Sequence, residues 1–102
     1  MGITLVSSQY TRQFGLSGAL ILDVTESSPA ELAGLRPTAK NRNGEIELGD
    51  IIIAIDDEKI SSNNDLLNTL EKYAPDDTIS VTYDRNGRKK AVQLTLASSV
   101  NI

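Results

Sequence analysis

The chain contains no cysteine and no histidine among its 102 residues. Without cysteine, disulfide bonds and thiolate metal sites are excluded. Without histidine, Ser-His-Asp and Cys-His catalysis and most zinc sites are excluded as well. We therefore expect no catalytic residue, no metal and no cofactor, and we expect this chain to hydrolyse nothing on its own.

Long apolar runs and positive charge are also scarce. No run approaches the roughly 20 apolar residues that a membrane-spanning helix needs, and no signal peptide is visible. Acidic residues outnumber basic ones by 14 to 10, which gives a formal net charge of −4. Nucleic acid and anionic membrane surfaces are poor partners for such a chain, because both require a basic face.

The length suits one domain, which can bury about 60–65% of its unfolded surface and fold without disulfides. We expect the domain over residues 1–97 and a tail over residues 98–102. The tail ends in Ile102, an aliphatic residue with a free carboxylate, through which we predict weak self-association. The chain starts directly at Met1-Gly2-Ile3, and we expect it to be part of a longer protein whose targeting signal lies elsewhere.

A short helix is marked at both ends in the run Ser28-Pro29-Ala30-Glu31-Leu32-Ala33-Gly34-Leu35. Ser27 or Ser28 can cap its first turn, where Pro29 also fits, and Gly34 can end it in the left-handed conformation. Strands are expected before it over residues 3–6 and 19–24. The polar residues 7–13 are expected to form a loop or a helical turn.

A glycine turn then leads into a buried central strand over residues 50–56. We expect Gly49 to adopt unusual backbone angles and Asp50 to bond to nearby amides. Residues 36–47, before this turn, are expected to form a loop with a turn near Asn43-Gly44. This loop is either a passive surface segment or a contact surface.

The second half of the chain predicts a helix over residues 63–73, capped by Ser61 or Ser62, and two strands over residues 78–84 and 89–96. Asn86-Gly87 predicts a tight hairpin between these strands. The basic residues at this hairpin form a patch that is interpreted as making the hairpin charged and aggregation-resistant; they are Arg85, Arg88, Lys89 and Lys90. The acidic clusters at 56–58 and 76–77 are interpreted as solvated turns rather than a catalytic pair.

These segments, in this order, resemble the PDZ domain, and in particular the PDZ modules of HtrA-type serine proteases. The resemblance rests on the aliphatic strand, Ser28-Pro29-Ala30, Ala33-Gly34-Leu35 and Gly49-Asp50-Ile51-Ile52, and it covers about residues 2–96. It implies an α+β fold: a PDZ-like, partly open β-barrel of five or six strands, capped by two helices, in the circularly permuted arrangement of protease PDZ modules.

The resemblance also implies a site. Such modules take up a peptide, usually by its free C-terminus, as an extra strand beside a nest of backbone amides and an apolar hole. The nest would lie at the start of the chain, and the later helix would form the other wall, although the sequence leaves open which of two adjacent leucines faces the ligand. The predicted peptide-binding residues are Met1, Gly2, Ile3, Thr4, Leu5, Asn63, Leu66, Leu67 and Leu70.

For the longer protein, the resemblance implies an HtrA-type serine endopeptidase in the periplasm, cell envelope or an organelle lumen. The module would serve substrate recognition and regulation, with its own protease domain and the C-termini or extended segments of unfolded or signalling proteins as partners. Two alternatives stay open. One is a PDZ module of another protease or secretion protein, and the other is a domain that mainly forms oligomer contacts through residues 36–47.

Overall fold

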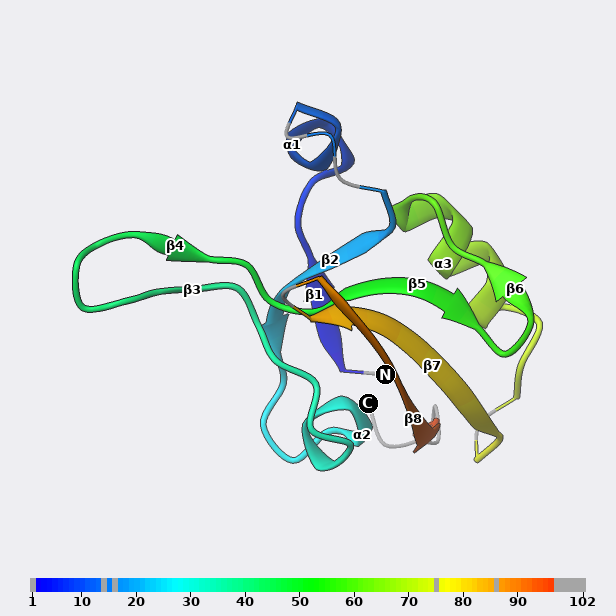
Figure 1. The fold of residues 1–102 in the computed structure, drawn as a ribbon. Helices are drawn as coiled ribbons and strands as arrows, with labels where there is room; N and C mark the ends of the chain where they lie inside the picture. The colour runs from blue at the N-terminus through cyan, green and yellow to red at the C-terminus, as the bar shows by residue number, and fades with distance from the viewer. Residues whose placement is uncertain (1, 14, 16, 75, 86, 97–102) are drawn as a thin grey trace.

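A computed structural model describes residues 2–13, 15, 17–74, 76–85 and 87–96. Figure 1 shows a strongly curved sheet with α2 and α3 beside it and the β3–β4 hairpin pointing away from the body. In chain order the elements are β1 (Ile3–Leu5), α1 (Ser8–Gln13), β2 (Ala19–Val24), α2 (Pro29–Leu32), β3 (Ala39–Lys40), β4 (Ile46–Glu47), β5 (Ile51–Ile55), β6 (Glu58–Lys59), α3 (Asn63–Leu70), β7 (Thr78–Arg85) and β8 (Arg88–Thr95).

The main sheet is antiparallel and runs in the order β1-β2-β5-β7-β8, with β6 paired to β5. It is open rather than closed, because β1 and β8 stand at opposite ends of this order. The expected α+β class and partly open, six-stranded arrangement are thereby confirmed. At the end of the β7–β8 hairpin Arg85 pairs with Arg88, and Gly87 has φ +83°; Asn86, the other residue of the predicted turn, lies outside the described residues.

The buried side chains follow the alternation of the strands of this sheet. On β7, for example, Ile79, Val81 and Tyr83 are buried, while the residues between them are half-buried. Burying one such aliphatic side chain contributes about 1.5–3 kcal/mol. The buried hydrophobic cluster consists of Ala19, Ile21, Ala30, Leu35, Ile52, Ile55, Ile60, Leu66, Ile79, Val81, Tyr83 and Leu94.

Serine side chains start α2 and α3, as predicted. Ser28 caps α2 and Ser62 caps α3, each by accepting a hydrogen bond from the backbone N–H three residues on. Helix α3 ends at Leu70 rather than at Tyr73, because the chain tightens there into turns in which Tyr73 N donates to Leu70 O. Within the described residues, no helix has the length and apolar character needed to cross a bilayer.

The segment predicted as a loop over residues 36–47 contains a small hairpin, in which β3 pairs with β4. Its turn is held by Asn41, whose Oδ1 accepts hydrogen bonds from the N–H groups of Asn43 and Glu45. Gly44 has φ +81°, which supports the predicted turn at this point. The two strands were not predicted, since a strand of two residues is too short to show periodicity.

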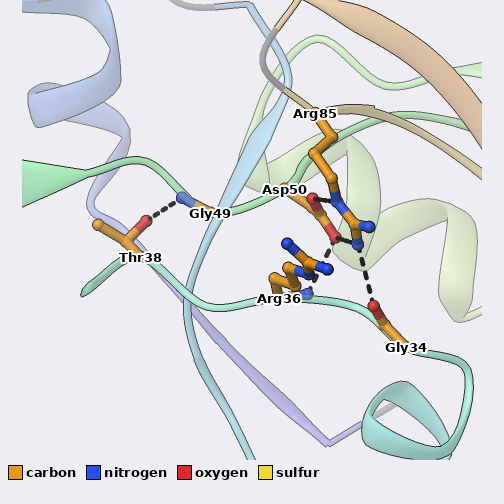
Figure 2. A network of polar contacts seen from close by, with 6 residues as sticks. All are labelled: Gly34, Arg36, Thr38, Gly49, Asp50 and Arg85. Carbon is orange, nitrogen blue, oxygen red and sulfur yellow. Dashed lines mark hydrogen bonds and ion pairs between the residues drawn. The ribbon is translucent and has the colours of Figure 1, made fainter. Parts of the chain in front are cut away.

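Gly49 and Asp50 act differently from the expectation. Gly49 is required for a close approach rather than for a positive φ, because a Cβ there would lie 2.5 Å from Pro37 C and from Thr38 N. Asp50 is fully buried and bonds to distant groups: its carboxylate accepts from Arg36 N at 2.9 Å and from the Arg85 guanidinium at 2.7 and 2.8 Å. Figure 2 shows this network.

Arg85 therefore does not share the exposed surface of the basic patch predicted at this hairpin, whereas Arg88, Lys89 and Lys90 are exposed. The Arg85 side chain is only 18% exposed, and its Nη2 also donates to Gly34 O at 2.9 Å. The hydrogen bond and ion pair with Asp50 raise the pKa of Arg85 above its usual value. Arg85 thus joins the end of β7 to the start of β5 and to the loop after α2.

Candidate functional site

Strand β1 stands at the end of the sheet, and among the described residues it pairs only with β2. Ile3 lies opposite Val24, and the neighbouring bond runs from Thr25 N to Gly2 O at 2.7 Å. In an antiparallel ladder, hydrogen-bonded and non-bonded pairs alternate. The N–H and C=O groups of Ile3 therefore point away from β2, toward the open edge.

A register shift between Thr4 and Leu5 keeps this orientation along the strand. Thr4 lies opposite Asp23, whereas Leu5 lies opposite Ile21, so that Leu22 is the extra residue on β2. After the shift, the ladder bond from Val6 N to Leu20 O restores the alternation, at 2.9 Å. Leu5, like Ile3, thus directs its backbone groups to the open edge.

The start of β1 is shaped by Gly2, which has φ +80°. Its carbonyl oxygen accepts hydrogen bonds from Thr25 N at 2.7 Å and from Ser28 Oγ at 3.4 Å. A side chain at Gly2 would collide with Ser28 Cβ, so only glycine fits here. Met1, the other predicted residue of this turn, lies outside the described residues.

Helix α3 is tied to the far end of β1 through Asn63, whose Nδ2 donates to Val6 O at 2.7 Å. The other amide atom of Asn63, Oδ1, is buried and has no hydrogen-bond partner among the described residues. Asn63 is the first residue of the helix, and Leu67 and Leu70 follow at i+4 and i+7. This spacing places the three side chains on one face of α3.

The two adjacent leucines differ sharply in burial. Leu66 is 1% exposed and belongs to the core cluster, whereas Leu67 is 55% exposed. Leu70 is partly buried against the same cluster. On β1, Ile3 and Leu5 are half-buried against the core, and Thr4 is exposed.

Two residues that contact this region were not predicted as part of it. Thr25 and Ser28 both bond to Gly2 O, from the turn that precedes α2. The sequence identified Ser28 only as a helix cap, which is a local role. Its contact with Gly2, 26 positions earlier, leaves no local signal in the sequence.

Of the acidic residues at 56–58, Asp56 and Asp57 lie in an exposed turn between β5 and β6, and Glu58 begins β6. Asp56 accepts hydrogen bonds from Tyr73 Oη at 2.6 Å and from Ser80 N at 2.9 Å, and these two bonds lower its pKa. The same bond to Asp56 is the main cause that raises the pKa of Tyr73 to about 12. Residues 56–58 are exposed, and Asp56 uses its carboxylate for structural hydrogen bonds. Both observations fit the interpretation of this cluster as a solvated turn.

The fold and this edge define a class of small α+β domains in which a free strand edge ends beside a helix. The chain belongs to the PDZ domain family, since the PDZ_2 family profile, described as PDZ domain, matches residues 1–96.

The chain is also similar to curated relatives and to solved structures. The chain is 35% identical to Protease Do-like 1, chloroplastic, from Arabidopsis thaliana over 96 residues, which are 94% of this chain and 22% of that protein. A solved structure of the HtrA-type protease AlgW with a decapeptide matches 94% of this chain and 28% of its own, with TM-score 0.68 and 24% identity. An aminopeptidase N family protein from Idiomarina loihiensis matches 95% of this chain and 13% of its own, with TM-score 0.69 and 26% identity.

This chain spans about a fifth of the length of the curated relatives that it matches. Those relatives are named as Do-like proteases, and their similarity falls within the part of this chain that matches the PDZ domain family. The low identity of the AlgW structure makes that likeness one of fold alone.

Proposed function

We propose that this chain binds the free C-terminus, or an extended segment, of another polypeptide as an additional strand on β1. The observation that carries the proposal is the unpaired edge of β1, along which Ile3 and Leu5 direct their backbone groups outward. An added strand pairs through such backbone groups and gains specificity from side-chain pockets. The AlgW structure holds a decapeptide, which supports the same use for this related fold.

The proposed site has three parts. Gly2 and Ile3, with the predicted Met1 that lies outside the described residues, would form the nest for the terminal carboxylate. The positive φ of Gly2 supports this, because it lets successive amides converge on one anion. Ile3, Thr4 and Leu5 supply the strand edge. The wall of α3 is formed by Asn63, Leu67 and Leu70, with Leu66 behind them in the core.

Of the two leucines left open by the sequence, Leu67 is the one proposed to touch the ligand, since Leu66 has almost no exposed surface. The affinity is expected to be modest. A few strand hydrogen bonds and one buried side chain, after the cost of ordering the peptide, give a Kd of roughly micromolar or weaker.

Within a longer protein, the module is proposed to recognise substrates for an HtrA-type serine endopeptidase and to regulate it. Support comes from the Do-like relatives. The partners would be hydrophobic C-termini of unfolded or signalling proteins and the protease domain itself, in an organelle lumen, the periplasm or the cell envelope. With no histidine in the sequence, the module is expected to leave hydrolysis to that protease domain. Weak self-association through Ile102 stays a prediction, because residues 97–102 lie outside the described part.

The test is a titration of isotope-labelled protein with short peptides ending in Val, Ala or Phe, together with an amidated control, followed by backbone amide shifts. We expect shifts over residues 2–5 and 63–70 that shrink when the terminal carboxylate is amidated. Shifts of equal size for acid and amide would contradict carboxylate recognition. Absence of shifts over residues 2–5 for every peptide would contradict strand addition on β1.

A second candidate function, an oligomer contact domain, is favoured by the projecting hairpin. Ile46 and Leu48 are 54% and 46% exposed, and they line a cavity of about 540 Å³ with Tyr10 of α1. Replacing Ile46 and Leu48 together by serine, followed by sedimentation velocity, tests this candidate. A loss of assembly with peptide binding intact would favour it, and unchanged assembly would exclude the hairpin as the contact.

A further inference from the structure

The side chain of Ser28 serves two elements at once. It is only 8% exposed, and its Oγ accepts a hydrogen bond from Glu31 N at 3.3 Å as the cap of α2. The same hydroxyl donates to Gly2 O at 3.4 Å. A serine hydroxyl has one proton to donate and lone pairs to accept, so both bonds can exist together.

These contacts belong to a closed set around the start of β1. Thr25 N donates to Gly2 O at 2.7 Å, and Ser28 N donates to Thr25 O at 3.2 Å. Gly2, Thr25 and Ser28 are therefore joined pairwise. The bond from Thr25 is the shorter one on Gly2 O. Ser28 adds a longer bond, and it lies so close to position 2 that a Cβ there would collide with its side chain.

The orientation of one peptide group follows from this arrangement. The peptide bond between Gly2 and Ile3 is planar, and in the trans form its C=O and N–H point in opposite directions. With Gly2 O held toward Thr25 and Ser28, the N–H of Ile3 points to the open edge. A rotation of this peptide would present a carbonyl oxygen to a carboxylate and repel it.

We propose that Ser28 is a positioning residue for carboxylate recognition, acting by holding the Gly2–Ile3 peptide so that the Ile3 amide faces the ligand. The inference rests on the proposed function, in which Gly2 and Ile3 form the carboxylate nest. It adds that the cap of α2 and the ligand site share one hydroxyl group. Ser28 therefore contributes to binding of the ligand's terminal carboxylate and not to binding of the rest of the peptide.

The test compares two matched variants, Ser28→Ala and Ser62→Ala. Ser62 caps α3 in the same way, by accepting from Asp65 N at 3.2 Å, and no contact with Gly2 is recorded for it among the described residues. The affinities of one Val-terminated peptide and of its C-terminal amide are measured by calorimetry or fluorescence anisotropy, at a temperature where all variants are folded.

For Ser28→Ala we expect the Kd of the acid peptide to rise about three- to tenfold, the range for loss of one weak hydrogen bond. The Kd of the amide should stay unchanged, so the preference for acid over amide falls. Ser62→Ala should keep the wild-type preference. In the ligand-free protein, the chemical shift and the hydrogen-exchange rate of the Ile3 backbone amide should differ from the wild type in Ser28→Ala. In Ser62→Ala both should equal the wild-type values.

An unchanged preference in Ser28→Ala, or an equal weakening of both peptides, would overturn the inference while leaving peptide binding intact. A wild-type protein that does not distinguish acid from amide would instead overturn the proposed nest itself. If Ser28→Ala does not fold, Ser28→Gly takes its place, because glycine is well tolerated as a helix cap, has no hydroxyl donor and adds no charge beside the proposed nest. Retention of the wild-type preference by Ser28→Gly would likewise overturn the inference.

Discussion

Two ion pairs in this chain have nearly the same length and different surroundings. The Arg85 Nε to Asp50 Oδ1 distance is 2.7 Å, and the Lys72 Nζ to Glu58 Oε1 distance is 2.8 Å. The side chains of the first pair are 18% and 1% exposed, whereas those of the second are 60% and 47% exposed. Removal of the cation should therefore have very different consequences for stability.

We expect Arg85→Met to lower the free energy of unfolding by about 3 kcal/mol, the lower end of the range for breaking a buried pair, because the arginine keeps some contact with water. The buried Asp50 carboxylate would then keep Arg36 N as its remaining recorded donor among the described residues. For a domain of this size, such a loss corresponds to a fall in Tm of about 12–24 °C. Lys72→Met, the matched control at the exposed pair, should change stability by less than about 1 kcal/mol.

The assay is urea unfolding of both single variants, of Asp50→Asn, and of the double variant Asp50→Asn with Arg85→Met. The double variant should lose less than the sum of its two single variants, with a coupling energy of about 1–3 kcal/mol, because neither partner is then left charged and unpaired. Equal losses for Arg85→Met and Lys72→Met would refute the argument from burial. If the stability losses of Asp50→Asn and Arg85→Met instead add up to the loss of the double variant, Asp50 and Arg85 act independently.

Three further predictions follow from single contacts. In an absorbance titration of the wild type, Tyr73 should ionise near pH 12. The stabilisation from its bond to Asp56 therefore holds below pH 10 and is lost as the pH rises toward 12. In Asp56→Asn, the ionisation of Tyr73 should move back toward pH 10. Leu66→Ala should cost about 2–5 kcal/mol in chemical unfolding. By contrast, Leu67→Ala should leave stability nearly unchanged and raise the peptide Kd, and equal stability losses for both leucines would contradict their assignment. Gly49→Ala should lower Tm measurably because its Cβ would press on the backbone of the preceding segment; an unchanged Tm would refute the close approach.

The sequence predicted those features whose cause is local. The cap at Ser28, the stop at Gly34 and the turn at Gly87 each depend on the conformational preferences of one or two residues. These preferences act within a few consecutive residues, so a short segment of sequence is enough to predict them. The order of such signals was sufficient to indicate the fold.

Features that depend on contacts between distant segments were missed. Asp50 and Arg85 are 35 positions apart, and each taken alone resembles an ordinary turn or surface residue. The Gly2–Ser28 contact has the same character. Whether Ile3 directs its amide to the open edge depends on its register with β2, which a one-residue shift would reverse.

The choice between Leu66 and Leu67 shows a different limit. Neighbouring residues on a helix are 100° apart, so both can fall within one broad apolar stripe. Only the packing of α3 against the core separates the buried residue from the exposed one. The candidate site was thus predicted as a neighbourhood, and the roles within it required the structure.

The β3–β4 hairpin is fastened where it leaves the body. Thr38 Oγ1 accepts a hydrogen bond from Gly49 N, and Arg36 N donates to the Asp50 carboxylate, so the two ends of the hairpin are bonded to each other (Figure 2). Thr38 Oγ1 also donates to Ile21 O, which bonds the hairpin to β2. Its tip is closed by hydrogen bonds among residues 41–47, including one from Asn41 Nδ2 to Glu47 Oε1 at 3.4 Å. Residues grafted into that tip would therefore leave the anchored ends in place, which makes this hairpin the natural place for the chain to vary its length.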